Sequence, residues 1–447
     1  MSQEQTDLSE IAADVTKLAL ELGAQEASVS VSQSVSTELT QREQVLEKTQ
    51  QSNSLGVHIE LLVDDKFSSH SASDVRLDSL RPFLERAIQA THYLEVDENR
   101  KLPNFDEMGY FEGDLQVNDD CWNAHSPEAR RQLLNNLEAK CHEVSQNSEQ
   151  NVTVRSITNH VWDSKVRSHV HCSNGYSAGW DRTSFGMGGE ITLVDENDRL
   201  PEAYDYRSVR YLSDLPSIDE VAQTLLKKAQ ARIGSSSIAS DRYPILLENR
   251  VAAKLLGVLI GPMQGTSIYE KRSCLLDKLG QKIASSNLSI WDDPHVLRGL
   301  ASCPFDNDGF ATEKRMLVED GVLQTYLLSL YNSRRLKTPK TVGSTSNIVI
   351  APSDQSPQSL LNPLPKAISI EGFLGGNSNP ISGDFSFGIT GRYFENGQFV
   401  QGISEMNVSG NVFELFERFE IAADDVWTFS NYKVPSLLFS DIQCSGV

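Results

Sequence analysis

The first hundred residues alternate between helix-like and strand-like patterns of apolar side chains. Apolar residues recur every three or four positions over 8–22, which predicts a helix, and Gly23 follows as a stop signal. Apolar and polar residues then alternate in short runs over 26–63, which predicts two or three antiparallel strands. The helical pattern returns over 77–94. We therefore expect a small α+β domain over residues 1–100.

A second unit is predicted after an acidic, turn-rich linker over 95–124. Its first element is a helix over 126–144, in which Ser126 can cap the N-terminus and Pro127 occupies the first helical position. The elements predicted after it are strands at 151–159, 165–172 and 176–196 and a helix over 217–232. Together they predict a middle α+β domain over residues 115–235.

The pattern changes again after Tyr243, where strands become more frequent than helices. Helical spacing predicts helices over 249–262 and 270–281, and a later one over 411–419. The strand-rich remainder predicts a third domain over residues 240–447, a barrel or a sandwich with a few helices.

Two hairpins are the sharpest local predictions in this third domain. Asp320-Gly321 and Asn396-Gly397 each stand between alternating apolar runs, as a type I′ turn requires, because both central residues of that turn need positive φ. The fold class predicted for the whole chain is α+β: N-terminal units of antiparallel strands with flanking helices, followed by a β-rich C-terminal domain.

Charge and hydropathy narrow the functional classes. The 447 residues include 40 basic and 61 acidic side chains, a net charge of −21, which argues against a nucleic-acid partner. No apolar run approaches the roughly 20 residues of a membrane span, so no membrane partner is expected. The start, MSQEQTDLSEIAADV, lacks the basic and apolar regions of a secretory signal. We expect a cytoplasmic protein whose six scattered cysteines are reduced.

Few residues are spaced as metal ligands. His169 and His171 share one face of a predicted strand and could both reach one ion, but no third ligand accompanies them locally, so a half-buried strand edge is favoured. Asp306–Gly309 resembles the start of a calcium loop, yet its twelfth position is Leu317 instead of Glu, which indicates a turn. H-E-x-x-H does not occur in the chain.

A glycine-rich segment over 375–391, GGNSNPISGDFSFGITG, would let another backbone approach closely. One interpretation is a wall of a peptide-binding cleft, in which an extended peptide adds to a strand edge. The other is a series of tight turns inside a barrel or sandwich, and the sequence leaves both open. The residues that would contact the peptide are Gly375, Gly376, Asn377, Gly383, Asp384 and Phe385.

Four blocks of the C-terminal half together resemble the TldD/PmbA family, most closely its PmbA (TldE) branch. The most specific signature is SGDFSFG followed by ENG and SGN, and the blocks are 243–280, 289–312, 321–336 and 375–415. The upstream α+β units fit the same family in layout. The resemblance implies a bacterial proteolytic system built from two homologous subunits.

The resemblance also locates a degenerate catalytic helix. TldD-like subunits carry H-E-x-x-x-H on a helix, plus a cysteine near the C-terminus, and these bind zinc while the Glu acts as general base. Placed on VAAKLLGVLIGPMQG (251–265), that helix puts Leu256, Gly257 and Gly261 where His, Glu and His would stand. None of the three can bind zinc or accept a proton. We do not assign the ligand role to Cys444, three residues from the end.

The resemblance therefore implies a non-catalytic PmbA/TldE-like subunit of a two-component zinc metalloprotease that acts on unfolded or modified peptides. Its partners would be a TldD-like subunit, which holds the zinc, and the peptide; this chain would hold no metal or cofactor. A homodimer of the isolated chain stays open. One alternative is a metalloprotease in its own right, using His169, His171 and a distant carboxylate. Another is a regulatory binding protein related to DNA gyrase or a toxin–antitoxin system.

Overall fold

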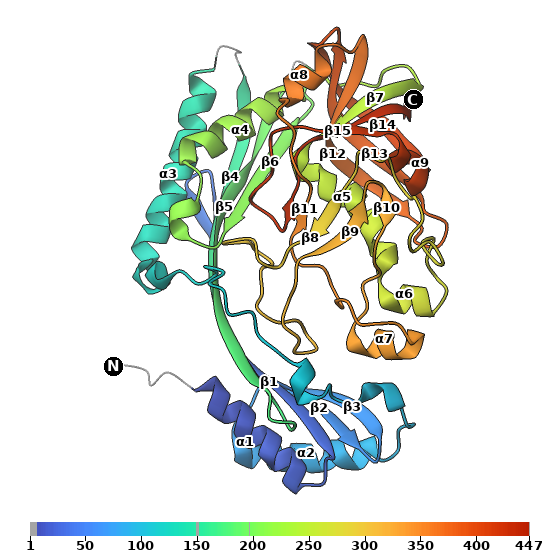
Figure 1. Ribbon diagram of the computed structural model, residues 1–447. Coiled ribbons are helices and arrows are strands. Elements are labelled where there is room, and N and C mark those ends of the chain that lie inside the picture. The colour runs from blue at the N-terminus through green and yellow to red at the C-terminus, as the bar shows by residue number, and fades with distance from the viewer. Residues whose placement is uncertain (1–6, 149–151, 196, 447) are drawn as a thin grey trace.

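A long curved sheet runs through the N-terminal half of the protein, and a β-barrel forms much of the C-terminal half (Figure 1). The computed structural model describes residues 7–148, 152–195 and 197–446. The mixed α+β class and the barrel alternative for the C-terminal region are both confirmed. No helix in these ranges is long and apolar enough to cross a membrane.

The curved sheet has six antiparallel strands in the order β3-β2-β1-β4-β5-β6. The strands are β1 (Glu26–Arg42), β2 (Val45–Val63), β3 (Lys66–Ala72), β4 (Thr153–Cys172), β5 (Ser177–Val194) and β6 (Glu202–Val209). Strand β1 pairs with β4 from Ser28 opposite Cys172 to Arg42 opposite Thr158. The predicted first and middle domains therefore share one sheet, and the division of the chain at 1–100, 115–235 and 240–447 stays a prediction.

Two pairs of helices cover the sheet at its two ends (Figure 1). They are α1 (Leu8–Glu21) with α2 (Leu77–Thr91), and α3 (Pro127–Gln146) with α4 (Ile218–Gln230). Ser126 caps α3 as predicted, because its hydroxyl accepts a hydrogen bond from the Ala129 N–H. The linker between α2 and α3 contains only short 3₁₀ turns, at Glu98–Arg100, Phe105–Glu107 and Asp120–Ala124. A further 3₁₀ turn, Leu212–Asp214, precedes α4.

The barrel closes because β14 pairs with β17, which completes the ring β14-β13-β12-β7-β17. Its strands are β7 (Asp241–Leu247), β12 (Lys366–Ser378), β13 (Asp384–Glu395), β14 (Gln398–Asn411) and β17 (Leu437–Gly446). The short strand β15 (Phe419–Ala422) pairs antiparallel with β17. Helices α5 (Asn249–Ile260) and α9 (Val412–Glu417) pack into the large core of this half.

A smaller five-stranded sheet lies beside the barrel. Its strands are β8 (Ile290–Asp292), β9 (Arg315–Glu319), β10 (Val322–Leu323), β11 (Ile348–Val349) and β16 (Tyr432–Lys433). The short helices near it are Gly261–Met263 (3₁₀), α6 (Gly265–Tyr269) and α7 (Leu330–Leu336), whereas α8 (Pro357–Leu361) packs against the barrel through Leu360 and Leu361. Both predicted hairpins are confirmed: φ is 48° and 79° at Asp320 and Gly321, and 48° and 74° at Asn396 and Gly397.

Three element predictions are wrong. The two strands expected at 151–159 and 165–172 are parts of the single strand β4, and β6 was not predicted. The chain stays extended through Asp163 because it is paired there with β1 and β5 on both sides, and the buried Asp163 carboxylate pairs with Arg130 of α3. The helix expected over 270–281 is a series of turns, because Lys271 and Asp277 have φ of 57° and 60°, which an α-helix cannot accommodate.

Candidate functional site

Helix α5, onto which the family's catalytic helix was placed, has two unlike faces. Leu255, Leu256 and Leu259 are 0% exposed and belong to the core of the C-terminal half. Gly257 and Gly261 lie on the other side, where a Cβ added to either would meet no atom within 4 Å. The helix therefore combines a packed apolar face with a face that has room for larger side chains.

The three positions of the degenerate slot do not converge on one point. Leu256 is buried in the core, whereas Gly261 is exposed at the end of the helix. Positions five apart on a regular helix differ by about 140°, which agrees with this separation. Their side chains offer no oxygen, nitrogen or sulfur donor, so the residues present do not fit a zinc ion.

The tail cysteine is also unsuited to binding a metal. Cys444 lies on β17 inside the barrel, opposite Val408 of β14, and is 0% exposed. Burial raises the pKa of its thiol to about 12, so the thiol stays protonated at neutral pH. Within the described ranges, no three His, Cys, Asp or Glu side chains gather as a metal-binding group.

His169 and His171 lie on β4, at the end that pairs with β1. The Nε2 atom of His169 is 2.9 Å from the Ser177 hydroxyl, and burial lowers the pKa of this histidine, with the nearby His171 as a smaller cause. Both histidines are half-buried, as predicted, but β4 is paired there with β1 on one side and with β5 on the other, so the predicted strand edge is wrong.

The glycine-rich segment forms the β12–β13 hairpin of the barrel. Gly375 and Gly376 have φ of 65° and 101°, and a Cβ on Gly376 would lie 2.2 Å from the Ser386 carbonyl oxygen. Here the small residues let two strands of the same chain approach each other. Strand β13 has a paired strand on each side, whereas β12 pairs with β7 only over Ile368–Ile370 and with β13 alone at Asn377 and Ser378, so both interpretations stay open.

The side chains of the hairpin differ in accessibility. Gly375, Gly376, Asn377 and Asp384 are exposed, whereas Gly383 is buried and Phe385 is packed in the core. Hydrogen bonds from Ser382 and Asn411 lower the pKa of Asp384. A peptide that docks here would therefore touch the exposed tip and would not reach Phe385.

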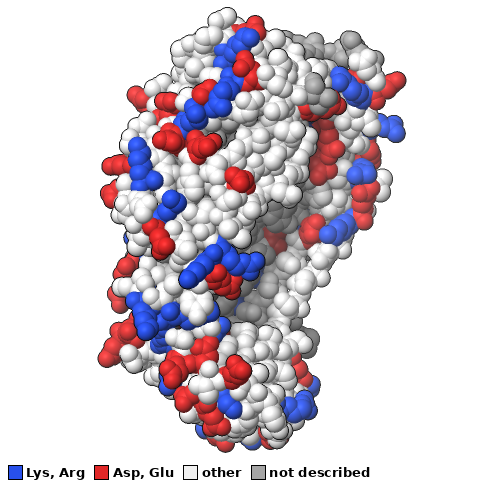
Figure 2. Space-filling model, turned by 90° about the vertical axis from the view of Figure 1, so that its right-hand side faces the viewer, with Lys and Arg blue, Asp and Glu red and all other residues white. Residues whose placement is uncertain are grey.

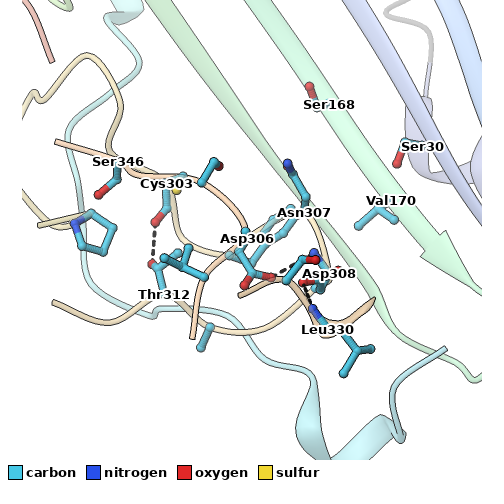
Figure 3. Close-up of a pocket in the computed structure, with 18 of the residues that line it drawn as sticks. Ser30, Ser168, Val170, Cys303, Asp306, Asn307, Asp308, Thr312, Leu330 and Ser346 are labelled. Carbon is cyan, nitrogen blue, oxygen red and sulfur yellow. Dashed lines mark hydrogen bonds between the residues drawn. The ribbon is translucent and has the colours of Figure 1, made fainter. Parts of the chain in front are cut away.

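A cavity of about 1100 Å³ lies between the curved sheet and the C-terminal half, and we name it the interlobe cleft. Strands β1, β4 and β5 form one wall, and residues 292–315 and 342–346 form much of the other. Figure 2 shows a face of the molecule that is hollowed between its upper body and lower lobe, with acidic and basic side chains interspersed. In Figure 3, Ser168 and Val170 of β4 lie opposite the turn that carries Asp306.

One wall of the cleft follows a simple pattern in the sequence. Ser28, Ser30 and Ser32 of β1 line the cavity, while Val29 and Val31 between them belong to the core under α1 and α2. Because successive strand residues face opposite sides, the repeated Ser-Val alternation builds one polar and one apolar face. That alternation was a signal for the cleft, but its opposite wall comes from distant segments.

The turn at Asp306–Gly309 forms the rim of the cleft, and its interpretation as a turn is confirmed. The Asp306 carboxylate accepts hydrogen bonds from the backbone N–H of Asp308 and Phe310, each 3.0 Å long, and pairs with Lys340. Asp308 accepts a 2.8 Å bond from the Leu330 N–H, and burial raises its pKa. These carboxylates bond to groups of the protein itself.

Comparison with known proteins identifies the family. The PmbA/TldA metallopeptidase C-terminal domain matches residues 240–446, and domain 1 of the same metallopeptidases matches residues 27–91. A solved Bacteroides thetaiotaomicron structure, of a protein proposed to modulate DNA gyrase, is 30% identical, covers 98% of both chains and has a TM-score of 0.92. The chain belongs to the PmbA/TldD family.

Two curated relatives and a second structure extend the match. The metalloprotease PmbA of Escherichia coli O157:H7 is 25% identical over 94% of this chain and 92% of its own. The PmbA homologue of Haemophilus influenzae is 26% identical over 100% and 97%. TldE from Thermococcus kodakarensis, 18% identical, shares the fold with a TM-score of 0.86 over 98% of this chain and 100% of its own. The family membership predicted from the sequence is therefore confirmed.

Proposed function

We propose that this chain is the supporting, non-catalytic subunit of a two-component zinc metalloprotease that cleaves unfolded or modified peptides. A TldD-like homologue would supply the zinc and the general base. The observation that carries the proposal is the composition of α5, where Leu256, Gly257 and Gly261 hold no donor atom at the positions aligned with the family's catalytic helix. The buried, protonated Cys444 supports the same conclusion.

In this role the chain would contribute structure and peptide contacts. The interlobe cleft has the volume to accept part of a peptide, because small-molecule and cofactor sites typically measure about 300–1,000 Å³. The exposed tip of the β12–β13 hairpin, including Gly375, Asn377 and Asp384, is a second surface that a peptide could contact. The partner would perform the hydrolysis.

Mixing the two subunits tests this function. We expect the purified chain alone to leave an unfolded peptide intact, and the mixture with its TldD-like homologue to cleave it faster than the homologue alone. A sizing column should show a complex, and metal analysis should find zinc in the homologue. Equal activity of homologue and mixture, together with no complex on the column, would contradict the proposal.

The E. coli and H. influenzae relatives are named as metalloproteases, which favours a second candidate, a peptidase in its own right. His169 and His171 would then bind the metal with a distant carboxylate. Stoichiometric zinc in the purified chain, lost in His169→Ala but retained in the matched control His92→Ala, would support this candidate. His92 is a suitable control because it lies on the surface and contacts Asp64.

A regulatory binding role is the third candidate, favoured by the description of the B. thetaiotaomicron relative as a modulator of DNA gyrase. The net charge of −21 favours a basic protein over DNA as the ligand in that case. Binding of purified gyrase to the chain, with no stimulation of a TldD-like homologue, would support this third candidate.

A further inference from the structure

Two arginines in the interlobe cleft form no ion pair within the part of the chain that the structure describes. Arg182 on β5 and Arg315 on β9 both line the cavity, from opposite walls. Neither side chain makes a hydrogen bond or an ion pair with any other residue in the described ranges, and the Nε atom of Arg315 is buried without a partner. An unpaired guanidinium away from water is costly, since burial of a charge is normally offset by a partner.

The neighbours of the two arginines leave their charges available. The guanidinium of Arg182 lies 4.8 Å from the centre of the Trp180 ring, and burial lowers its pKa. The acid that interacts electrostatically with Arg315 is Asp292, whose carboxylate already accepts bonds from the N–H and hydroxyl of Ser346, each 2.6 Å long. An anion that enters the cleft would therefore meet guanidinium groups with free donors.

Arg210 in the cleft and Lys340 next to its rim differ from this pair because their donors are occupied. Arg210 donates to the carbonyl oxygens of Thr183, Gly299 and Leu300, which ties the sheet to the C-terminal half. Lys340 pairs with Asp306 below the rim turn. Such contacts hold the walls together, whereas Arg182 and Arg315 have no comparable structural partner.

We propose that Arg182 and Arg315 form a subsite for a peptide carboxylate, which would bridge the two walls of the interlobe cleft. Guanidinium groups bind carboxylates through pairs of parallel N–H···O bonds, and Arg is the side chain best suited to that geometry. The hydroxyls of Ser184 and Ser208, which line the same cavity, could donate to the bound group. The subsite rests on the proposed function, because it takes the ligand to be a peptide.

The carboxylate could be an acidic side chain or a free C-terminus, and three peptide probes distinguish these sources. Each is a fluorescein-labelled octapeptide of Gly, Ser and Ala. The first has a central Glu and an amidated C-terminus, the second has Gln in place of Glu, and the third has Gln and a free C-terminal carboxylate. Fluorescence anisotropy with the full-length chain at low ionic strength measures the affinity, since screening weakens such contacts at high salt.

We expect the Glu peptide or the free-carboxylate peptide to bind about tenfold more tightly than the amidated Gln peptide. Arg182→Ala and Arg315→Ala should each abolish the difference, and Arg182→Lys should retain part of it. The matched control is Arg272→Ala, which removes the same charge from an exposed side chain outside the cleft. Thermal unfolding of each variant checks that it is folded.

Three results would overturn the subsite: no detectable binding of either carboxylate peptide, equal binding of all three peptides, or unchanged discrimination in both alanine variants. These outcomes are separable from the failure of the proposed function. If the mixture with the homologue cleaves neutral peptides but the chain shows no charge discrimination, the supporting role stands and the subsite falls. If the chain discriminates between the peptides but neither binds nor stimulates the homologue, the subsite stands and the supporting role falls.

Discussion

Helix α5 and the interlobe cleft are two regions of one chain in which space and chemistry are distributed in opposite ways. Around Gly257 and Gly261 there is room for larger side chains, but no donor atom is present at either position. The cleft has charged groups with unused donors at Arg182 and Arg315, but the structure forms no metal-binding group from the described residues. In α5, the positions with space for larger side chains carry no donor atom. In the cleft, the charged groups with free donors do not form a metal-binding group.

On the proposed function, the difference means that a chain can lack the hydrolytic site and still contact the peptide. Replacing donors by Leu and Gly in a helix changes few backbone contacts, because the apolar face of α5 still packs into the core. The cleft depends instead on two walls from distant parts of the chain, tied together by Arg210. The following predictions test each side of the comparison, from the largest expected effect to the smallest.

The largest effect concerns Cys444, the tail cysteine. With the pKa of its thiol raised to about 12, its thiolate fraction at pH 8 should be about a thousandfold below that of an ordinary thiol. Iodoacetamide labelling of the native protein, followed by peptide mass spectrometry, should modify the exposed Cys121 and spare Cys444. Cys141, also buried and with its pKa raised to about 12, is the matched control. Rapid labelling of Cys444 that zinc prevents would instead make this cysteine a metal ligand.

The second prediction separates the two faces of α5. Leu256→Ala should lower the free energy of unfolding by about 2–5 kcal/mol, because it leaves a cavity in the core. Lys254→Ala, on the exposed face of the same helix, should cost less than about 1 kcal/mol. Urea unfolding followed by circular dichroism measures both. Similar losses in the two variants would mean that Leu256 does not face the core.

The third prediction concerns the rim of the cleft. The ammonium of Lys340 pairs with Asp306 and lies 3.8 Å from Asp308, and its side chain is 11% exposed. Lys340→Met should lower the free energy of unfolding by roughly 1.5–3 kcal/mol, because two carboxylates lose their counter-charge. Lys314→Met is the control, since Lys314 is 52% exposed in its pair with Asp293 and should cost less than about 1 kcal/mol.

The loss at the rim should also depend on pH. Burial already raises the pKa of Asp308, so the folded state binds a proton more readily than the unfolded state. Stability from this group therefore increases as the pH falls through its folded-state pKa. The deficit of Lys340→Met should shrink when unfolding is measured at acidic rather than neutral pH. A deficit that is unchanged by pH would show that it does not arise from the lost attraction between Lys340 and the ionised carboxylates.

Local signals in the sequence were sufficient where the structure depends on neighbouring residues. Ser126 and Pro127 define the start of α3, and the Asp-Gly and Asn-Gly pairs define two hairpins, because caps and tight turns are satisfied within a few residues. Family motifs added the identity of the C-terminal half. The helical spacing over 249–262 correctly predicted α5, in which Leu255, Leu256 and Leu259 form the core face.

Signals failed where distant residues decide the structure. Strand β4 continues through Asp163, whose carboxylate pairs with Arg130 of α3. No pattern among the neighbouring residues predicts this contact. The helix expected over 270–281 is replaced by turns with positive φ at Lys271 and Asp277. The sequence does not distinguish Arg182 and Arg315 from other charged residues, because only the packing of two sheets brings both of them to one cavity.

The smallest effect, and the one of opposite sign, is expected at Gly257. An added Cβ meets nothing within 4 Å, and alanine loses less backbone entropy than glycine in a helix, so Gly257→Ala should raise the free energy of unfolding by about 0.5–1 kcal/mol. Gly265→Ala is the matched control: its Cβ would lie 2.8 Å from the Asn332 Cβ, and it should be destabilising. Urea unfolding measures both variants. If Gly257→Ala is as damaging as Gly265→Ala, the second face of α5 has no space for larger side chains. The contrast drawn between α5 and the cleft is then wrong.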